Sequence, residues 1–152
     1  MKKIVFDIET QNTFQEVGSN DPVDLSISLV GVYDYESGEY SSYLENELGS
    51  LWRVIENTEA LITFNGDHFD IPLLNKYYPG DLLKIKSIDL LKEMQKSAGR
   101  RMKLDQIAEG TLGVKKSGHG LDAIRWWKEG DIESIRKYCL DDVKITKDVY
   151  EY

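Results

Sequence analysis

Four acidic residues, Asp7, Glu9, Asp70 and Asp142, have the chemical type and the placement to bind a divalent cation. Asp7 and Glu9 end the apolar run 4–6 and lie two residues apart, so in a strand both carboxylates point to the same face. Carboxylates on an otherwise buried face are costly unless a cation compensates them. No cluster of Lys or Arg lies beside them in the sequence. We therefore expect a metal to supply the positive charge.

Asp142 interrupts the apolar stripe of the last predicted helix, which Asp131 caps as a plain N-cap. The stripe consists of Ile135, Cys139, Ile145, Thr146 and Val149. Tyr138 lies four residues before Asp142 and so shares its face of the helix. Asp is a poor residue for a helix interior, which indicates a specific role. Acceptance of a hydrogen bond from a core group is the alternative for Asp142, and taken alone it is the better one.

The segment 65–70 carries the fourth acid, Asp70, between a predicted buried strand and a predicted helix. This places Asp70 near the C-terminal edge of the sheet, where the sites of α/β proteins gather. A simple helix N-cap is the alternative for Asp70. The two histidines, His68 and His119, are each predicted to be loop residues rather than metal ligands or bases.

The elements that must position these residues follow from hydrophobic periodicity and turn signals. The predicted strands cover residues 2–7, 25–33, 40–44, 60–64 and 84–89. The predicted helices cover residues 48–57, 70–78, 90–96, 103–112, 121–129 and the C-terminal segment, with a Gly-rich loop at 113–120. This order predicts an α/β fold, in which a three-strand antiparallel meander joins parallel strands and helices flank the mixed sheet. We expect one domain over residues 1–152.

Composition limits the class of protein. Hydrophobic residues make up 41% and charged residues 30%, as in ordinary folded domains. The single Cys cannot form an internal disulfide, which favours a reducing, cytoplasmic setting. No apolar run is long enough for a signal peptide or a membrane span, so no membrane partner is expected. The net charge of −8 argues against bulk coating of nucleic acid, but a metal-filled carboxylate site would reverse the local sign.

Three segments together resemble the exonuclease motifs of the DEDD superfamily, in order: residues 6–10, residues 65–70 and residues 138–142. Tyr138, four residues before the final acid, resembles the tyrosine (DEDDy) branch. The sequence is most similar to the 3′–5′ proofreading domains of family B DNA polymerases and to related stand-alone domains of ribonuclease H-like fold. Each motif alone is a weak signal, but three in order, each in the expected structural setting, are specific.

The resemblance implies a two-metal-ion 3′–5′ exonuclease that hydrolyses phosphodiester bonds at nucleic-acid 3′ ends and releases nucleoside 5′-monophosphates. It implies that Asp7, Glu9, Asp70 and Asp142 hold two ions and that Tyr138 positions the attacking water. Carboxylate ligands suit Mg²⁺ or Mn²⁺ better than Zn²⁺. A neutral phenol would orient the water by hydrogen bonding rather than act as a general base.

The expected substrate is a single-stranded 3′ end, most simply of DNA, and a polymerase, helicase or repair protein is a possible partner. Thr10, Asn65 and Phe69, which lie in the motifs, are predicted substrate contacts. Lys115 and Lys116 are candidates for contacts to phosphates. Arg100 and Arg101 are also candidates, and solvated surface is the equal alternative for all four basic residues.

Other functions fit parts of the sequence. The 5–10 segment also resembles the nucleophile loop of haloacid-dehalogenase-like phosphatases, although Glu9 stands where those enzymes have Asp. An endonuclease that recognises nucleic-acid structure, or a ribonuclease, would use the same fold. A catalytically silent nucleic-acid-binding module is a non-enzymatic alternative. The sequence does not separate DNA from RNA, or end-directed from internal cleavage.

Overall fold

The computed structural model describes residues 2–98, 104 and 120–152. Its sheet contains five strands: β1 (Lys3–Thr10), β2 (Ile27–Asp34), β3 (Glu39–Leu44), β4 (Ala60–Thr63) and β5 (Lys86–Asp89). The strand order is β3-β2-β1-β4-β5, with β1–β2 and β2–β3 antiparallel and β1–β4 and β4–β5 parallel. The predicted mixed sheet, a meander joined to parallel strands, is confirmed.

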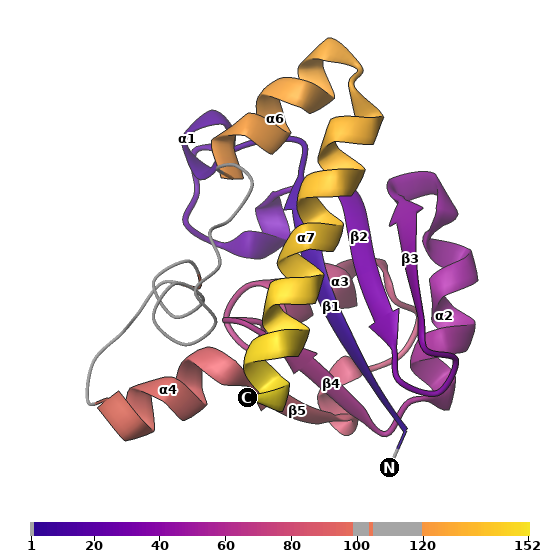
Figure 1. Cartoon of the computed structure of the whole chain (residues 1–152). Coiled ribbons are helices and arrows are strands. Elements are labelled where there is room, and N and C mark those ends of the chain that lie inside the picture. Colours follow the sequence, from indigo (N-terminus) through magenta and orange to yellow (C-terminus); the bar gives the residue numbers. More distant parts are fainter. Residues whose placement is uncertain (1, 99–103, 105–119) are drawn as a thin grey trace.

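Helices cover both faces of this sheet (Figure 1). They are α1 (Phe14–Val17), α2 (Leu48–Asn57), α3 (Asp70–Tyr77), α4 (Leu90–Ala98), α6 (Gly120–Glu129) and α7 (Ile132–Glu151). Short 3₁₀ helices at Pro22–Asp24, Glu45–Glu47 and Leu82–Lys84 connect several of these elements. Alternation along β1 explains the two layers, because Phe6 packs with α2 and α3 whereas Val5 packs with Val143 of α7.

Several boundaries differ from the sequence prediction. Strand β1 continues to Thr10 rather than ending at residue 7, because backbone pairing with β2 extends beyond the apolar residues to the polar ones. Helix α1 lies in a stretch predicted as a loop, and its capping box joins Thr13 and Glu16. The helix predicted at 103–112 and the loop at 113–120 lie outside the described residues, apart from Leu104 and Gly120.

Helix α7 packs across strands β1 and β2 of the sheet. Asp131 accepts a hydrogen bond from the Ser134 backbone N–H at its N-terminus, as predicted. Gly31 of β2 pairs with Asp7 of β1 and lies under α7, where a Cβ atom would come within 3.0 Å of the Cys139 Sγ. The absence of a side chain at Gly31 therefore allows α7 to approach the acidic face of β1.

Candidate active site

Asp7 and Glu9 point from β1 towards α7, as the two-residue spacing predicts. The ligand atoms of Asp7, Glu9 and Cys139 lie within 4.8 Å of one another. Glu9 is buried and Asp7 is half-buried. Two carboxylates that converge in this way repel each other unless a cation or a proton lies between them.

Asp142 and Tyr138 both lie buried on α7. The charge of Asp142 acts on Asp70 and on Cys139, which lies beside Asp7 and Glu9. The ring of Tyr138 makes an edge-to-face contact with Trp126 of α6, with the ring centroids 6.0 Å apart. Trp126 was not among the residues selected from the sequence. Packing between α6 and α7 therefore fixes the ring of the tyrosine that belongs to the third motif.

Asp70 is the first residue of α3, and the N-cap position belongs to Phe69. The N-cap alternative for Asp70 is therefore wrong. Its side chain is only 4% exposed, and its Oδ2 atom has no hydrogen-bond partner among the residues that the structure describes. Burial raises the pKa of the Asp70 carboxyl well above its usual range, and the charges of Asp7, Asp89 and Asp142 raise it further.

Cys139 lies beside the acids, with its Sγ 3.5 Å from the backbone oxygen and 3.9 Å from the Oδ2 of Asp7. Burial raises the pKa of its thiol well above the usual value, and the nearby carboxylates of Asp7, Glu9 and Asp142 raise it further. The group therefore stays a protonated thiol. The oxygen donors, rather than the sulfur, are the ligands suited to a hard cation.

The donor set fits a divalent cation. An unpartnered, buried carboxylate oxygen on Asp70 and the converging acids of β1 and α7 are what a Mg²⁺ or Mn²⁺ centre requires. Of the four acids that the sequence selected, the ligand atoms of Asp7 and Glu9 lie within 4.8 Å of each other, and the charges of Asp7 and Asp142 act on Asp70, although these residues come from three elements far apart in the chain.

The sequence profile of the RNase_H (ribonuclease H) superfamily matches residues 4–152. The chain belongs to the ribonuclease H superfamily. Its fold matches a solved family B DNA polymerase from the hyperthermophilic archaeon Pyrobaculum calidifontis, with a TM-score of 0.78 and 18% sequence identity. This match covers 99% of the chain and 24% of the polymerase, so the chain spans about a quarter of that protein's length. No curated protein sequence matches the chain.

The superfamily match agrees with the resemblance drawn from the three motifs and confirms the ribonuclease H-like fold class. It overturns the haloacid-dehalogenase alternative, because one profile accounts for the chain from β1 to α7.

The predicted substrate contacts of this ribonuclease H-like domain differ in their surroundings. Thr10 is buried, and its hydroxyl donates to the Asn12 backbone oxygen at 3.0 Å. Phe69 is half-buried and packs edge-to-face on Phe14, with ring centroids 6.1 Å apart. Asn65 adopts a left-handed backbone conformation with φ of 67°. Contact of Thr10, Asn65 and Phe69 with a substrate stays a prediction.

The predicted basic contacts Lys115, Lys116, Arg100 and Arg101 lie outside the described residues, as does His119. His68 is an exposed loop residue, as predicted.

Sequence reasoning missed one acid, Asp89, which is 4% exposed at the end of β5. A signal was present, because Asp89 ends a predicted strand that runs parallel to the strand before Asp70. Parallel strands place their C-terminal ends at one edge of the sheet. Asp89 therefore reaches the same edge as the 65–70 segment.

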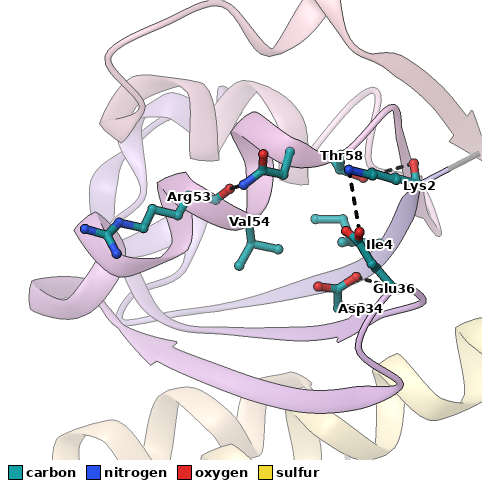
Figure 2. Close-up of a pocket in the computed structure, with 8 residues that line it drawn as sticks. Lys2, Ile4, Asp34, Glu36, Arg53, Val54 and Thr58 are labelled. Atoms are coloured by element: carbon teal, nitrogen blue, oxygen red, sulfur yellow. Dashed lines mark hydrogen bonds and ion pairs between the residues drawn. The ribbon is translucent and has the colours of Figure 1, made fainter.

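Two of the hollows on the described surface lie near segments discussed above. One of about 160 Å³ is lined by Lys2, Asp34, Glu36 and Arg53, among others (Figure 2). It lies at the N-terminal end of β1, and no residue of the three motifs lines it. A second, of about 600 Å³, lies between Ser19–Pro22 and the turn that holds Asp67 and His68. Of these two hollows, the second borders the motif that carries Asp70.

Proposed function

We propose that the protein is a two-metal-ion 3′–5′ exonuclease acting on single-stranded ends, most simply of DNA, and releasing nucleoside 5′-monophosphates. Membership of the ribonuclease H superfamily supports nuclease activity in general. The observation that carries the proposal is the buried, unpartnered carboxylate oxygen of Asp70, which faces the charges of Asp7 and Asp142. Burying these charges costs free energy when nothing compensates them, whereas a bound cation would compensate them and be held in place by them.

The proposed ligands are the carboxylates of Asp7, Glu9, Asp70 and Asp142. Two divalent ions held there would activate a water and neutralise charge on the leaving 3′-oxygen. The chain contributes rigid placement, since β1, α3 and α7 each hold at least one acid on regular secondary structure. Mg²⁺ and Mn²⁺ are the proposed ions because the donors are carboxylate oxygens.

Tyr138 is proposed to orient the attacking water through its phenol. Its ring is buried and held by Trp126, so the hydroxyl has a fixed direction. A group that orients the attacking water must itself be held in one direction, because a misplaced nucleophile reacts much more slowly.

The proposal is tested with labelled linear DNA and RNA, each with a free or a blocked 3′ end, and with a circular single strand. We expect shortening by single nucleotides from free 3′ ends, only with Mg²⁺ or Mn²⁺ and not with EDTA. Asp7→Ala is the matched inactive control. Cleavage of the circle at a comparable rate would instead support an endonuclease, and preference for RNA would support a ribonuclease. Metal binding without hydrolysis of any substrate would support the silent binding module.

The cellular location and the partner proteins of this activity are also proposals. The cytoplasm and a polymerase, helicase or repair partner are consistent with a domain that trims 3′ ends. None of the helices in the described part of the chain has the length and apolar character needed to cross a membrane.

A further inference from the structure

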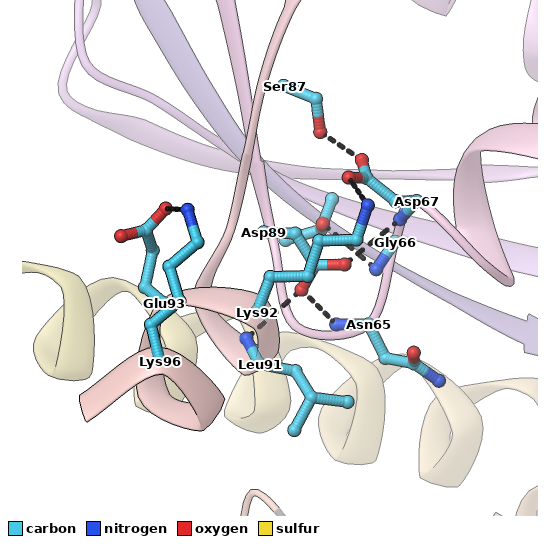
Figure 3. A network of polar contacts seen from close by, with 10 residues as sticks. Asn65, Gly66, Asp67, Ser87, Asp89, Leu91, Lys92, Glu93 and Lys96 are labelled. Carbon is cyan, nitrogen blue, oxygen red and sulfur yellow. Dashed lines mark hydrogen bonds and ion pairs between the residues drawn. The ribbon is translucent and has the colours of Figure 1, made fainter. Parts of the chain in front are cut away.

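Asp89 is a buried carboxylate that the proposed reaction does not use directly. Its Oδ1 accepts hydrogen bonds from the backbone N–H groups of Asn65 at 2.8 Å and Leu91 at 3.0 Å. Its Oδ2 accepts from the backbone N–H of Asp67 at 3.2 Å. Figure 3 shows this side chain reaching the turn after β4 from the end of β5. Both oxygens of Asp89 are thus directed at the chain itself.

The turn that Asp89 holds is conformationally demanding. Asn65 has a φ of 67°, the only positive φ among the described residues other than glycine. The next backbone N–H, that of Gly66, donates to the Thr63 Oγ1 at 3.0 Å. Asn adopts this conformation more readily than other non-glycine residues, and contacts from the surrounding chain hold it in place. The hydrogen bond from Asn65 to Asp89 is one of the contacts that impose it here.

This turn leads directly into the proposed metal site. The Gly66 backbone oxygen accepts a hydrogen bond from the Ile71 N–H at 2.8 Å, so the turn is joined to the first residues of α3. Asp70 is the residue before Ile71, and its Oδ2 accepts no hydrogen bond from the described part of the chain. The direction of the Asp70 side chain therefore depends on the turn, and the turn depends on Asp89.

Asp89 also lies close enough to act by charge. Its carboxylate is among the groups that raise the pKa of Asp70. Three backbone N–H groups donate to the two carboxylate oxygens of Asp89, which fixes the position of this side chain beside the site. A fixed negative group behind a carboxylate ligand increases the attraction of the site for a cation.

We infer that Asp89 is a positioning residue for the site: it fixes the 65–67 turn, and so holds the Asp70 carboxylate where it can bind a divalent cation. This inference rests on the proposed function, because it assigns Asp89 a role only if Asp70 binds metal. A plain cap that stabilises the fold without affecting metal binding is the alternative.

The first experiment compares Mn²⁺ binding by wild type, Asp89→Asn and Asp81→Asn, using calorimetric titration. Asn has one acceptor oxygen, so it cannot serve the amides on both sides of Asp89 and would face one of them with its own NH₂ group. We expect roughly 10-fold or greater loss of affinity, the range found for groups that support metal ligands. Asp81 is the matched control, because it also accepts a backbone N–H, that of Leu83 at 3.0 Å, but in an exposed 3₁₀ turn away from the acids.

The outcomes separate the inference from the proposed function. Equal Mn²⁺ affinity in wild type and Asp89→Asn overturns the inference alone and leaves the metal site intact. A wild-type protein that binds no Mn²⁺ overturns the proposed function, and the inference with it. A melt in EDTA accompanies each titration, so that affinity is compared only where both proteins are folded.

A second experiment needs no variant and decides the matter if Asp89→Asn does not fold. Coupling between two sites is reciprocal, so a turn that strengthens metal binding must itself be ordered by the metal. We expect Mg²⁺ to slow amide hydrogen exchange at Asn65 and Asp67 of wild type and to leave Leu83 unchanged. Unchanged exchange at Asn65 and Asp67 under saturating Mg²⁺ would overturn the positioning role.

Discussion

Replacement of Asp70 by Asn tests whether the acids form a metal site or a structural cluster. Asp70 is only 4% exposed, and its Oδ2 lacks a hydrogen-bond partner in the described chain. Burial, with the nearby charges of Asp7, Asp89 and Asp142, raises the pKa of its carboxyl well above the usual range. In metal-free protein the ionised form of Asp70 therefore opposes folding, and Asn removes that charge while keeping the shape.

The sign of the pH dependence follows from this shift. A carboxyl whose folded pKa exceeds its unfolded pKa of about 3.9 favours folding most below that pH, and the benefit disappears as pH rises through the folded pKa. Each unit of elevation corresponds to about 1.4 kcal/mol, or about 3–5 °C in melting temperature for a chain of this size. In EDTA, Asp70→Asn should melt above wild type near neutral pH, and the difference should shrink as pH falls towards about 4.

Metal should reverse the order of the two proteins. A ligand that binds only the folded state adds about 2.7 kcal/mol at a hundredfold excess over its dissociation constant, or about 5–11 °C for this chain. Asp70→Asn lacks one charged ligand and should gain less from Mg²⁺. The assay is a circular-dichroism melt of wild type, Asp70→Asn and the control Asp81→Asn, each with EDTA and with Mg²⁺, across this pH range.

The opposite pattern of melting temperatures would show that the acids are structural. If wild type is indifferent to Mg²⁺ and Mn²⁺, and Asp70→Asn melts below wild type in EDTA near neutral pH, then the acids stabilise the fold through partners of their own. The metal centre would then have to be abandoned, and the proposed hydrolysis with it.

Three further variants test separate parts of the argument. Tyr138→Phe should slow turnover without changing Mn²⁺ affinity in a calorimetric titration, and wild-type turnover would show that the ring only packs. Gly66→Ala should lower the free energy of unfolding in urea by about 1–3 kcal/mol, because its Cβ would clash with the Oγ1 atom of Thr63. Charge reversal at Lys115 and Lys116 should weaken binding of all sequences alike and reduce the salt slope by about 0.7 for each lost phosphate contact, whereas an unchanged slope would assign both residues to solvated surface.

Local pattern was sufficient for much of the fold. The spacing of Leu48, Leu51 and Ile55 predicted α2 with its observed bounds, because one apolar stripe at helical spacing has few other interpretations. The two-residue period of a strand likewise predicted that Asp7 and Glu9 share a face. These are statements about neighbours in the chain, for which geometry is nearly fixed.

Where polar residues occupy a regular element, local pattern was insufficient. The predicted end of β1 at residue 7 was too early, since Glu9 and Thr10 carry no apolar signal yet pair with β2. Helix α1 was missed for the same reason, because none of its four residues is buried. Backbone pairing with the distant strand β2 decided the end of β1, whereas α1 is held by the local capping box of Thr13 and Glu16.

Three motifs in order and the two-residue period of one strand were enough to select the candidate metal ligands from the sequence. Their proximity follows only from how distant segments pack, which no local pattern predicts. The Cys139 Sγ lies 3.5 Å from the Asp7 backbone oxygen across 132 positions of chain, because Gly31 lets α7 pack closely on the sheet. The role inferred for Asp89 likewise depends on β5 lying beside β4, since two of its three hydrogen-bond donors, the backbone N–H groups of Asn65 and Asp67, lie 24 and 22 positions away in the chain.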